Sequence, residues 1–256
     1  MPKPARTMTN QLEPSVPEQS FFSHLVELRD RLLRMVICVL LVFIGTASYA
    51  NEIYAYLAEP LLVHMPKNST MIAIDVASPF FTPFKLAFVV AVFIAIPFIL
   101  YQFWAFVAPG LYRHERVMIL PLLLASTLLF YGGAAFAYFV VFPLVFGFLT
   151  STAPAGVAVM TDITTYLDFV LAMFFAFGVS FEIPILTIVL VWTGIITRQS
   201  LTEKRPYVIV GVFVIAMFLT PPDALSQTLL ALPMWMLFES GLLFSRFFEG
   251  KRSEAE

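Results

Sequence analysis

Residues 79–107 read PFFTPFKLAFVVAVFIAIPFILYQFWAFV, a stretch that is apolar except for Lys85 and Gln102. A helix of this length is long enough to cross, with some tilt, a hydrocarbon core about 30 Å thick. Tyr101 and Trp104 stand near one end, where aromatic side chains are typical of a membrane interface. The whole chain of 256 residues has the same character, with 60% hydrophobic and 12% charged residues. No soluble fold could bury that much apolar surface, so the sequence predicts an integral membrane protein.

Five further apolar stretches accompany this one and predict an all-α membrane domain over 21–245 with six spans. Thr220-Pro-Pro-Asp223 is a strong turn signal that divides the last forty residues of this domain into two short spans. The first twenty residues are rich in Pro, Ser, Gln and Glu, which predicts a disordered tail, and 246–256 forms a second tail. The spans are expected at about 35–50, 79–107, 117–142, 166–192, 207–219 and 224–244.

The segment 21–34 repeats leucines at helical spacing among charged residues, which predicts an amphipathic interfacial helix leading into the first span. An alternative is a cleaved signal peptide, because Ser48-Tyr49-Ala50 resembles a small-x-small cleavage site. Such a leader would be unusually long and would contain several acids.

The positions of the basic residues predict the orientation, because Lys and Arg are retained on the cytoplasmic side of a membrane. With the N-terminus in the cytoplasm, only Lys67 and Lys85 fall elsewhere. This asymmetry favours an even number of spans with both termini in the cytoplasm. The residues placed there are Lys3, Arg6, Arg29, Arg31, Arg34, Arg113, Arg116, Arg198, Lys204, Arg205, Arg246, Lys251 and Arg252.

Prolines inside the spans predict bent helices, because each removes a backbone donor. Pro97, Pro121, Pro184 and Pro233 lie within spans, and Pro143 is expected to close the third. Bent helices favour a curved scaffold over a straight bundle, although proline is also simply commoner in membrane helices.

Glu182 lies in the interior of the fourth predicted span. An ionisable carboxyl at that depth costs several kcal/mol unless it meets water or a partner, so a functional role is the main hypothesis. The alternative is a protonated carboxyl that bonds a hydroxyl of a neighbouring helix. Lys85, near the end of its span, is interpreted as a lysine whose ammonium reaches the interface.

Two acids stand among bases on the predicted cytoplasmic side, Glu27 in HLVELR (24–29) and Glu115 in LYRHER (111–116). Two carboxylates at a membrane surface could accept two adjacent arginines through paired hydrogen bonds, a geometry that lysine cannot copy. The alternative is local pairing, of Glu27 with Arg31 and of Glu115 with Arg113 or Arg116.

The sequence gives little support to other classes of function. A single cysteine, Cys38, excludes an internal disulfide, and the three histidines are too dispersed to predict a metal site. A net charge of −2 disfavours a nucleic-acid binder. No phosphate-binding loop, HExxH or GxSxG motif is present, and no catalytic residue or cofactor is predicted. A proton-coupled small-solute transporter that uses Glu182 remains the main alternative, and an intramembrane enzyme has no second catalytic group.

Several motifs, in this order and on this topology, resemble the TatC family, the multi-spanning receptor subunit of the twin-arginine (Sec-independent) protein translocase. The resemblance extends from His24 to Arg246. The motifs that carry it are HLVELRDR (24–31), DVASPFFTP (75–83), YQFWAFVAP (101–109), LYRHER (111–116), FGVSFEIP (177–184) and LTPPDALSQ (219–227).

The resemblance implies a glove-shaped protein of the bacterial cytoplasmic (inner) membrane that binds twin-arginine signal peptides of folded cargo. It implies transport driven by the proton-motive force, with TatA, TatB and further copies of this chain as partners, in contact with membrane lipid. By the same resemblance, Glu27, Glu115, Arg29 and Phe106 belong to the signal-peptide site and Glu182 to a concave groove. The remaining assignments are partner docking for Met217, Thr220 and Gln227, and a periplasmic cap for Pro60.

Overall fold

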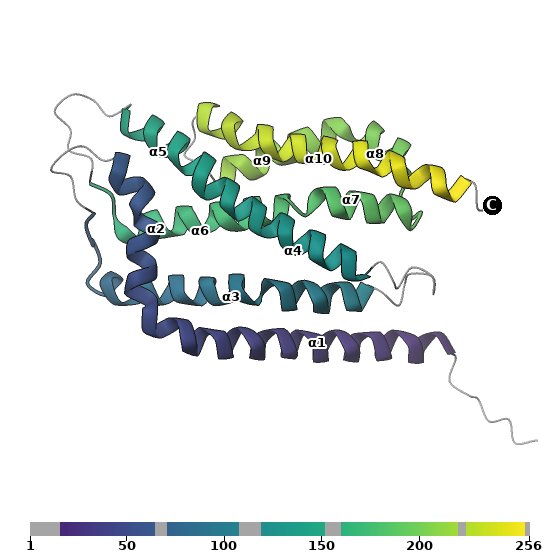
Figure 1. The fold of residues 1–256 in the computed structure, drawn as a ribbon, viewed down its shortest axis with the longest axis horizontal. Coiled ribbons are helices and arrows are strands. Elements are labelled where there is room, and N and C mark those ends of the chain that lie inside the picture. Colours follow the sequence, from purple (N-terminus) through teal and green to yellow (C-terminus); the bar gives the residue numbers. More distant parts are fainter. Residues whose placement is uncertain (1–15, 65–70, 108–118, 152–159, 220–223, 254–256) are drawn as a thin grey trace, which may run out of the picture.

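The computed structural model describes residues 16–64, 71–107, 119–151, 160–219 and 224–253, and within these ranges it is helical apart from connections and one isolated β-bridge (Figure 1). The elements are α1 (Val16–Thr46), the 3₁₀ turn η1 (Ala47–Tyr49), α2 (Ala50–His64), α3 (Ser78–Val107), α4 (Ile119–Phe136), the π-helical turn η4 (Ala137–Val141), α5 (Phe142–Ser151), α6 (Ile163–Ser180), α7 (Ile183–Trp192), α8 (Arg198–Glu203), α9 (Arg205–Leu219) and α10 (Ala224–Ser253).

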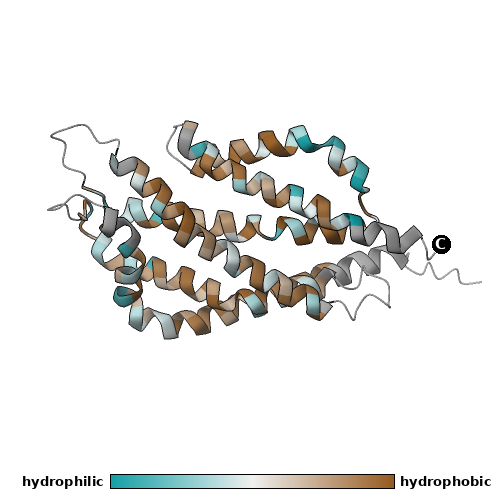
Figure 2. Cartoon of the chain, turned by 45° about the horizontal axis from the view of Figure 1, so that its top comes forward, coloured by the Kyte–Doolittle hydropathy of each residue, from teal (hydrophilic) through white to brown (hydrophobic). Residues whose placement is uncertain are grey.

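Five helical stretches are long and apolar enough to cross a membrane, and α9 is a shorter apolar helix. Apolar residues line the helices, and hydrophilic residues gather mainly toward their ends (Figure 2). These features confirm the predicted class, an all-α multi-pass membrane protein. The candidate spans are Leu25–Glu59, Ser78–Phe106, Leu120–Phe148, Ile163–Trp192 and Gln227–Arg246.

The first predicted tail is shorter than expected. The helix α1 begins at Val16, so the prediction of a disordered tail is wrong for residues 16–20, and residues 1–15 lie outside the described ranges. Pro17 falls in the first turn of α1, where its missing N–H has no helical partner to lose, and no Gly or Pro follows before Gly45. The interfacial helix and the first span are therefore one continuous helix. The helix α10 continues to Ser253, while its candidate span ends at Arg246, next to the expected boundary at 245.

The third span also runs further than predicted, because the helix passes through Pro143 and ends at Ser151. The π-helical turn η4 precedes this proline, and Pro143 lies in the first turn of α5. A π-helical turn changes the hydrogen-bond partners of the helix, so a residue without an N–H can follow it without ending the helix.

The fourth span is divided into α6 and α7 around residues 181 and 182. Pro184 lies in the first turn of α7 and cannot donate to the preceding turn, which accounts for the break. Glu182 therefore stands at the N-terminus of α7 and not inside a continuous helix, as the sequence had suggested.

Glycines let the helices around this break approach closely. A Cβ atom at Gly133 of α4 would lie 2.5 Å from the carbonyl oxygen of Phe177, and one at Gly241 of α10 would lie 2.8 Å from the Cα of Pro184. Small residues at such contacts are typical of helix packing in membranes. The main hydrophobic core surrounds α6 and takes buried residues from α2, α3, the η4–α5 run, α9 and α10, while α1 packs on α3 through Val39, Ala91 and Ala95 at the periphery.

Candidate functional site

Glu27 lies on α1 and is paired with a base of the same helix. Nε and Nη2 of Arg31 both donate to Oε1 of Glu27, over 3.0 Å and 2.5 Å. The Glu27 side chain is 37% exposed and the Arg31 side chain 18%. The local pairing that the sequence left open as an alternative is thus present for Glu27. The same contact demonstrates that this carboxylate accepts a guanidinium through two N–H groups.

Gln102 connects this pair to α3. Its Oε1 accepts from Nη1 of Arg31 over 3.2 Å, and the residue is buried, with 4% of its surface exposed. The guanidinium of Arg31 therefore spans two acceptors, one on α1 and one on α3. In the sequence, Gln102 stands out only as a polar residue in an apolar span, and this isolation is the signal that it has a partner.

The other predicted signal-site residues are placed as follows. Nε and Nη2 of Arg29 donate to Oδ1 of its neighbour Asp30, over 3.0 Å and 2.8 Å, and the Arg29 side chain is two-thirds exposed. Phe106 is half-buried near the end of α3, the helix that carries Gln102. Glu115 lies outside the described residues. The structure thus joins Glu27 to Arg31 and Gln102, which were not predicted to form part of the site.

Glu182 is buried, with 8% of its surface exposed, and its surroundings contrast with those of Glu27. Its Oε1 has no hydrogen-bond partner among the described residues, and the hydroxyl of Ser126 on α4 lies beside its side chain. The Oγ of Ser126 also accepts from Nε1 of Trp104 over 3.1 Å. A neighbouring helix therefore places a hydroxyl close to Glu182, as the alternative of a protonated, hydroxyl-bonded carboxyl requires.

A polar seam joins the starts of α3 and α6 at the opposite end of the molecule from the start of α1 (Figure 1). Ser78 and Thr82 of α3 hydrogen-bond with Thr164 of α6 over 3.0 Å and 3.2 Å. Further along, Nζ of Lys85 pairs with Oδ1 of Asp168. Lys85 is thus an ion-pair partner and not merely a lysine reaching the interface. Asp168 is an acid within the fourth predicted span, and its pairing with Lys85 was not predicted from the sequence.

A short clasp ties the segment after α2 to the start of α6. The backbone of Ile72 exchanges hydrogen bonds with Thr161 and Ile163, over 3.0 Å and 2.9 Å. Asp162 caps α6, with Oδ2 accepting from the N–H of Thr165 and Oδ1 from the N–H of Ile74. These backbone hydrogen bonds, that of Thr165 foremost, lower the pKa of Asp162 below its ordinary value, because they favour the ionised carboxylate.

The residues assigned to partner docking and to the cap are only partly described. Met217 is half-exposed on α9, and Gln227 of α10 donates from Nε2 to the carbonyl oxygen of Phe213 over 3.0 Å, which joins the two helices. Pro60 lies within α2. Thr220 lies outside the described residues.

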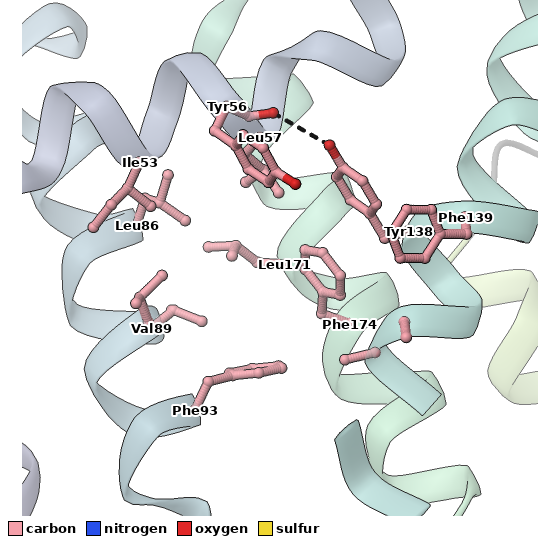
Figure 3. A pocket seen from close by; sticks show the side chains of 13 residues that line it. Ile53, Tyr56, Leu57, Leu86, Val89, Phe93, Tyr138, Phe139, Leu171 and Phe174 are labelled. Carbon is pink, nitrogen blue, oxygen red and sulfur yellow. Dashed lines mark hydrogen bonds between the residues drawn. The ribbon is translucent and has the colours of Figure 1, made fainter. Parts of the chain in front are cut away.

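An apolar pocket of about 340 Å³ lies between α2, α3, the α4–η4 run and α6 (Figure 3). Phe93 and Phe174 line it, and the hydroxyl of Tyr138 donates to the backbone carbonyl of Tyr56 at its edge, over 3.4 Å. Two tyrosines are the only lining side chains with a polar group, so this pocket offers little to a polar solute.

Comparisons with known proteins agree along nearly the whole chain. The family model described as "Sec-independent protein translocase protein (TatC)" matches residues 23–233. The Sec-independent protein translocase protein TatC of Haemophilus influenzae is 60% identical over 237 residues, covering 93% of each chain. Its counterpart in Escherichia coli K12 is 58% identical over 238 residues, covering 93% of this chain and 92% of the relative. A solved structure, "Crystal Structure of Twin Arginine Translocase Receptor- TatC", superposes with a TM-score of 0.80 at 38% identity and covers 88% of this chain and 99% of the other.

Proposed function

Since this chain belongs to the TatC family and is a membrane subunit of the Tat protein translocase, not an enzyme, we propose that it is the receptor that binds twin-arginine signal peptides of folded cargo. The observation that carries this proposal is the contact at Glu27, whose carboxylate already accepts two N–H groups of a guanidinium. An arginine of a signal peptide would find the same acceptor, half-exposed near the end of the molecule. Glu115 is the proposed second acceptor, with Arg29 and Phe106 beside the site.

We further propose six crossings, formed by α1, α3, the α4–η4–α5 run, the α6–α7 pair, α9 and α10. The 15 residues of α9 extend about 22 Å, which is short for a hydrocarbon core of about 30 Å. The beginning of α1 and the end of α10 lie at the same end of the molecule (Figure 1), in keeping with an even number of crossings. With the basic residues retained inside, both termini lie in the cytoplasm of a bacterium and the protein lies in its inner membrane.

The proposed partners are the single-span subunits TatA and TatB, with the proton-motive force driving transport. The surface of α9 and α10 supports a docking role, because Met217 and Phe218 expose apolar side chains there and Gln227 bridges the two helices. Thr220 is assigned to the same surface, Glu182 to a groove in a glove-shaped scaffold, and Pro60 of α2 to a periplasmic cap. Additional copies of this chain complete the proposed complex.

The first experiment measures the binding of synthetic signal peptides to the detergent-solubilised protein, with an Arg-Arg or a Lys-Lys pair at equal charge. We expect the Arg-Arg peptide to bind at least about tenfold more tightly, which corresponds to about 1.4 kcal/mol. Glu27→Gln and Glu115→Gln should each abolish this preference. Glu52→Gln, which neutralises an exposed acid on α2, is the matched control and should leave the preference unchanged.

Equal binding of both peptides in every variant would contradict the receptor proposal and would leave the acids as local ion pairs. Flux of small solutes into liposomes that contain this chain alone would then test the transporter alternative.

A further inference from the structure

Arg31 occupies the carboxylate that the proposed function assigns to the signal peptide. Two of its guanidinium nitrogens donate to Oε1 of Glu27, and the third donates to Oε1 of Gln102. The Arg31 side chain is only 18% exposed, so this arrangement is more than a solvated surface pair. A ligand that uses Glu27 must therefore replace or share a guanidinium that is already bound.

We propose that Arg31, held by Gln102, is a built-in competitor for Glu27 and thereby sets the selectivity of the site for arginine over lysine. The inference rests on the proposed function and assigns selectivity to a residue outside the predicted site. A group fixed on the same helix competes intramolecularly, so it is always present beside the carboxylate. A cation that binds the carboxylate weakly is then excluded, because it must first displace Arg31 from Glu27.

The chemistry of the two cations decides which of them displaces Arg31. A guanidinium presents a planar set of donors that can replace both N–H groups lost from Glu27, whereas an ammonium is a compact charge that is more strongly hydrated. The cost of displacing Arg31 thus disfavours the wrong ligand, in addition to the contacts with Glu27 that favour the right ligand.

Gln102 limits the cost of displacement for the correct ligand. It is buried on α3, so its amide stays in place when Glu27 changes partner. Arg31 keeps this acceptor after it leaves the carboxylate, and its partly buried guanidinium is not left without a partner, which would be costly. The two acceptors give Arg31 one position beside Glu27 and a second toward Gln102.

The test compares Arg31→Gln with Arg34→Gln, which removes the same charge from an exposed position one turn along α1. Binding of the Arg-Arg and Lys-Lys peptides is measured for wild type, both variants and Glu27→Gln. We expect Arg31→Gln to raise the affinity for the Lys-Lys peptide by at least about fivefold more than for the Arg-Arg peptide. Arg34→Gln should change both affinities by the same factor and preserve the wild-type ratio.

Two results would overturn the inference while the receptor function stands. One is an Arg31→Gln variant that binds the Arg-Arg peptide more weakly than wild type, which would make Arg31 a residue that positions Glu27. The other is an Arg31→Gln variant whose ratio of Arg-Arg to Lys-Lys peptide affinity equals that of Arg34→Gln. If wild type itself binds both peptides alike and Glu27→Gln changes nothing, the proposed function and this inference fail together. Arg31→Lys keeps the charge but lacks the planar donors, and it should reduce selectivity in the same direction if Arg31→Gln does not fold.

Discussion

The helix that carries Glu27 and the helix pair that carries Glu182 are held in the molecule in different ways. In the most apolar stretch of the first candidate span 6% of the residues are buried, against 50% in the fourth. The helix α1 packs mainly on α3, whereas α6 and α7 lie among α3, α4, α9 and α10. An acid on the peripheral helix can meet a ligand, while an acid at the central break is confined to the partners that its neighbours supply.

The largest expected effect tests the contrast in packing. Gly133→Ala should lower the free energy of unfolding by about 1–3 kcal/mol, because the new Cβ would overlap the backbone of Phe177 and a carbonyl cannot rotate away as a side chain can. Gly45→Ala on α1 is the matched control, since a Cβ there meets no atom within 4 Å. It should cause no loss, because alanine favours a helix more than glycine does. Thermal unfolding in detergent measures both variants.

Equal destabilisation by the two substitutions would contradict the contrast and would indicate that α1 is packed as closely as α6. A gain in stability from Gly133→Ala would also contradict it, because the helices would then have to separate at no cost.

The second prediction uses Ser126 of α4 and Gln102 of α3, whose hydrogen bonds join α3 to α4 and to α1. Ser126→Ala removes the acceptor of the Trp104 N–H, next to Glu182. An unsatisfied buried donor costs about 1–3 kcal/mol, so stability should fall by that amount while peptide affinity stays within about twofold of wild type. Gln102→Leu removes only a partner of Arg31, with a loss of about 1 kcal/mol. Gln102→Leu should also change the ratio of the affinities for the Arg-Arg and Lys-Lys peptides.

Melting curves and peptide binding on the same two preparations distinguish these effects. A loss of peptide affinity in Ser126→Ala would show that the region of Glu182 is coupled to the surface acid through α3. The two acids would then belong to one site, and the contrast between them would have to be abandoned.

Local patterns predicted the parts of this molecule that depend on hydropathy and failed where tertiary contacts decide. Apolar length indicated the helices, and the isolated charge of Glu182 indicated a residue with special surroundings. The interpretation of Pro143 as a helix end failed, because a π-helical turn accommodates it. Gln102 and Asp168 were not recognised as partners of Arg31 and Lys85, since they lie 71 and 83 residues away along the chain. Only the packing of α3 against α1 and α6 brings those pairs together.

The smallest expected effect concerns the clasp that ties the segment after α2 to the core. Asp162 has a lowered pKa in the folded chain because backbone N–H groups, that of Thr165 foremost, bond its ionised carboxylate. Its contribution to stability is therefore complete above the ordinary carboxyl pKa of about 3.9 and is lost as the pH falls through the lower pKa of the folded state.

Asp162→Asn should melt slightly below wild type at pH 7, because one amide oxygen cannot accept both N–H groups, and the gap in melting temperature should close below pH of about 3.9. Asp75→Asn removes an exposed acid near the same segment and is the charge control. A gap that persists unchanged at low pH would mean that the carboxylate does not hold the clasp, which would then depend on the backbone hydrogen bonds of Ile72.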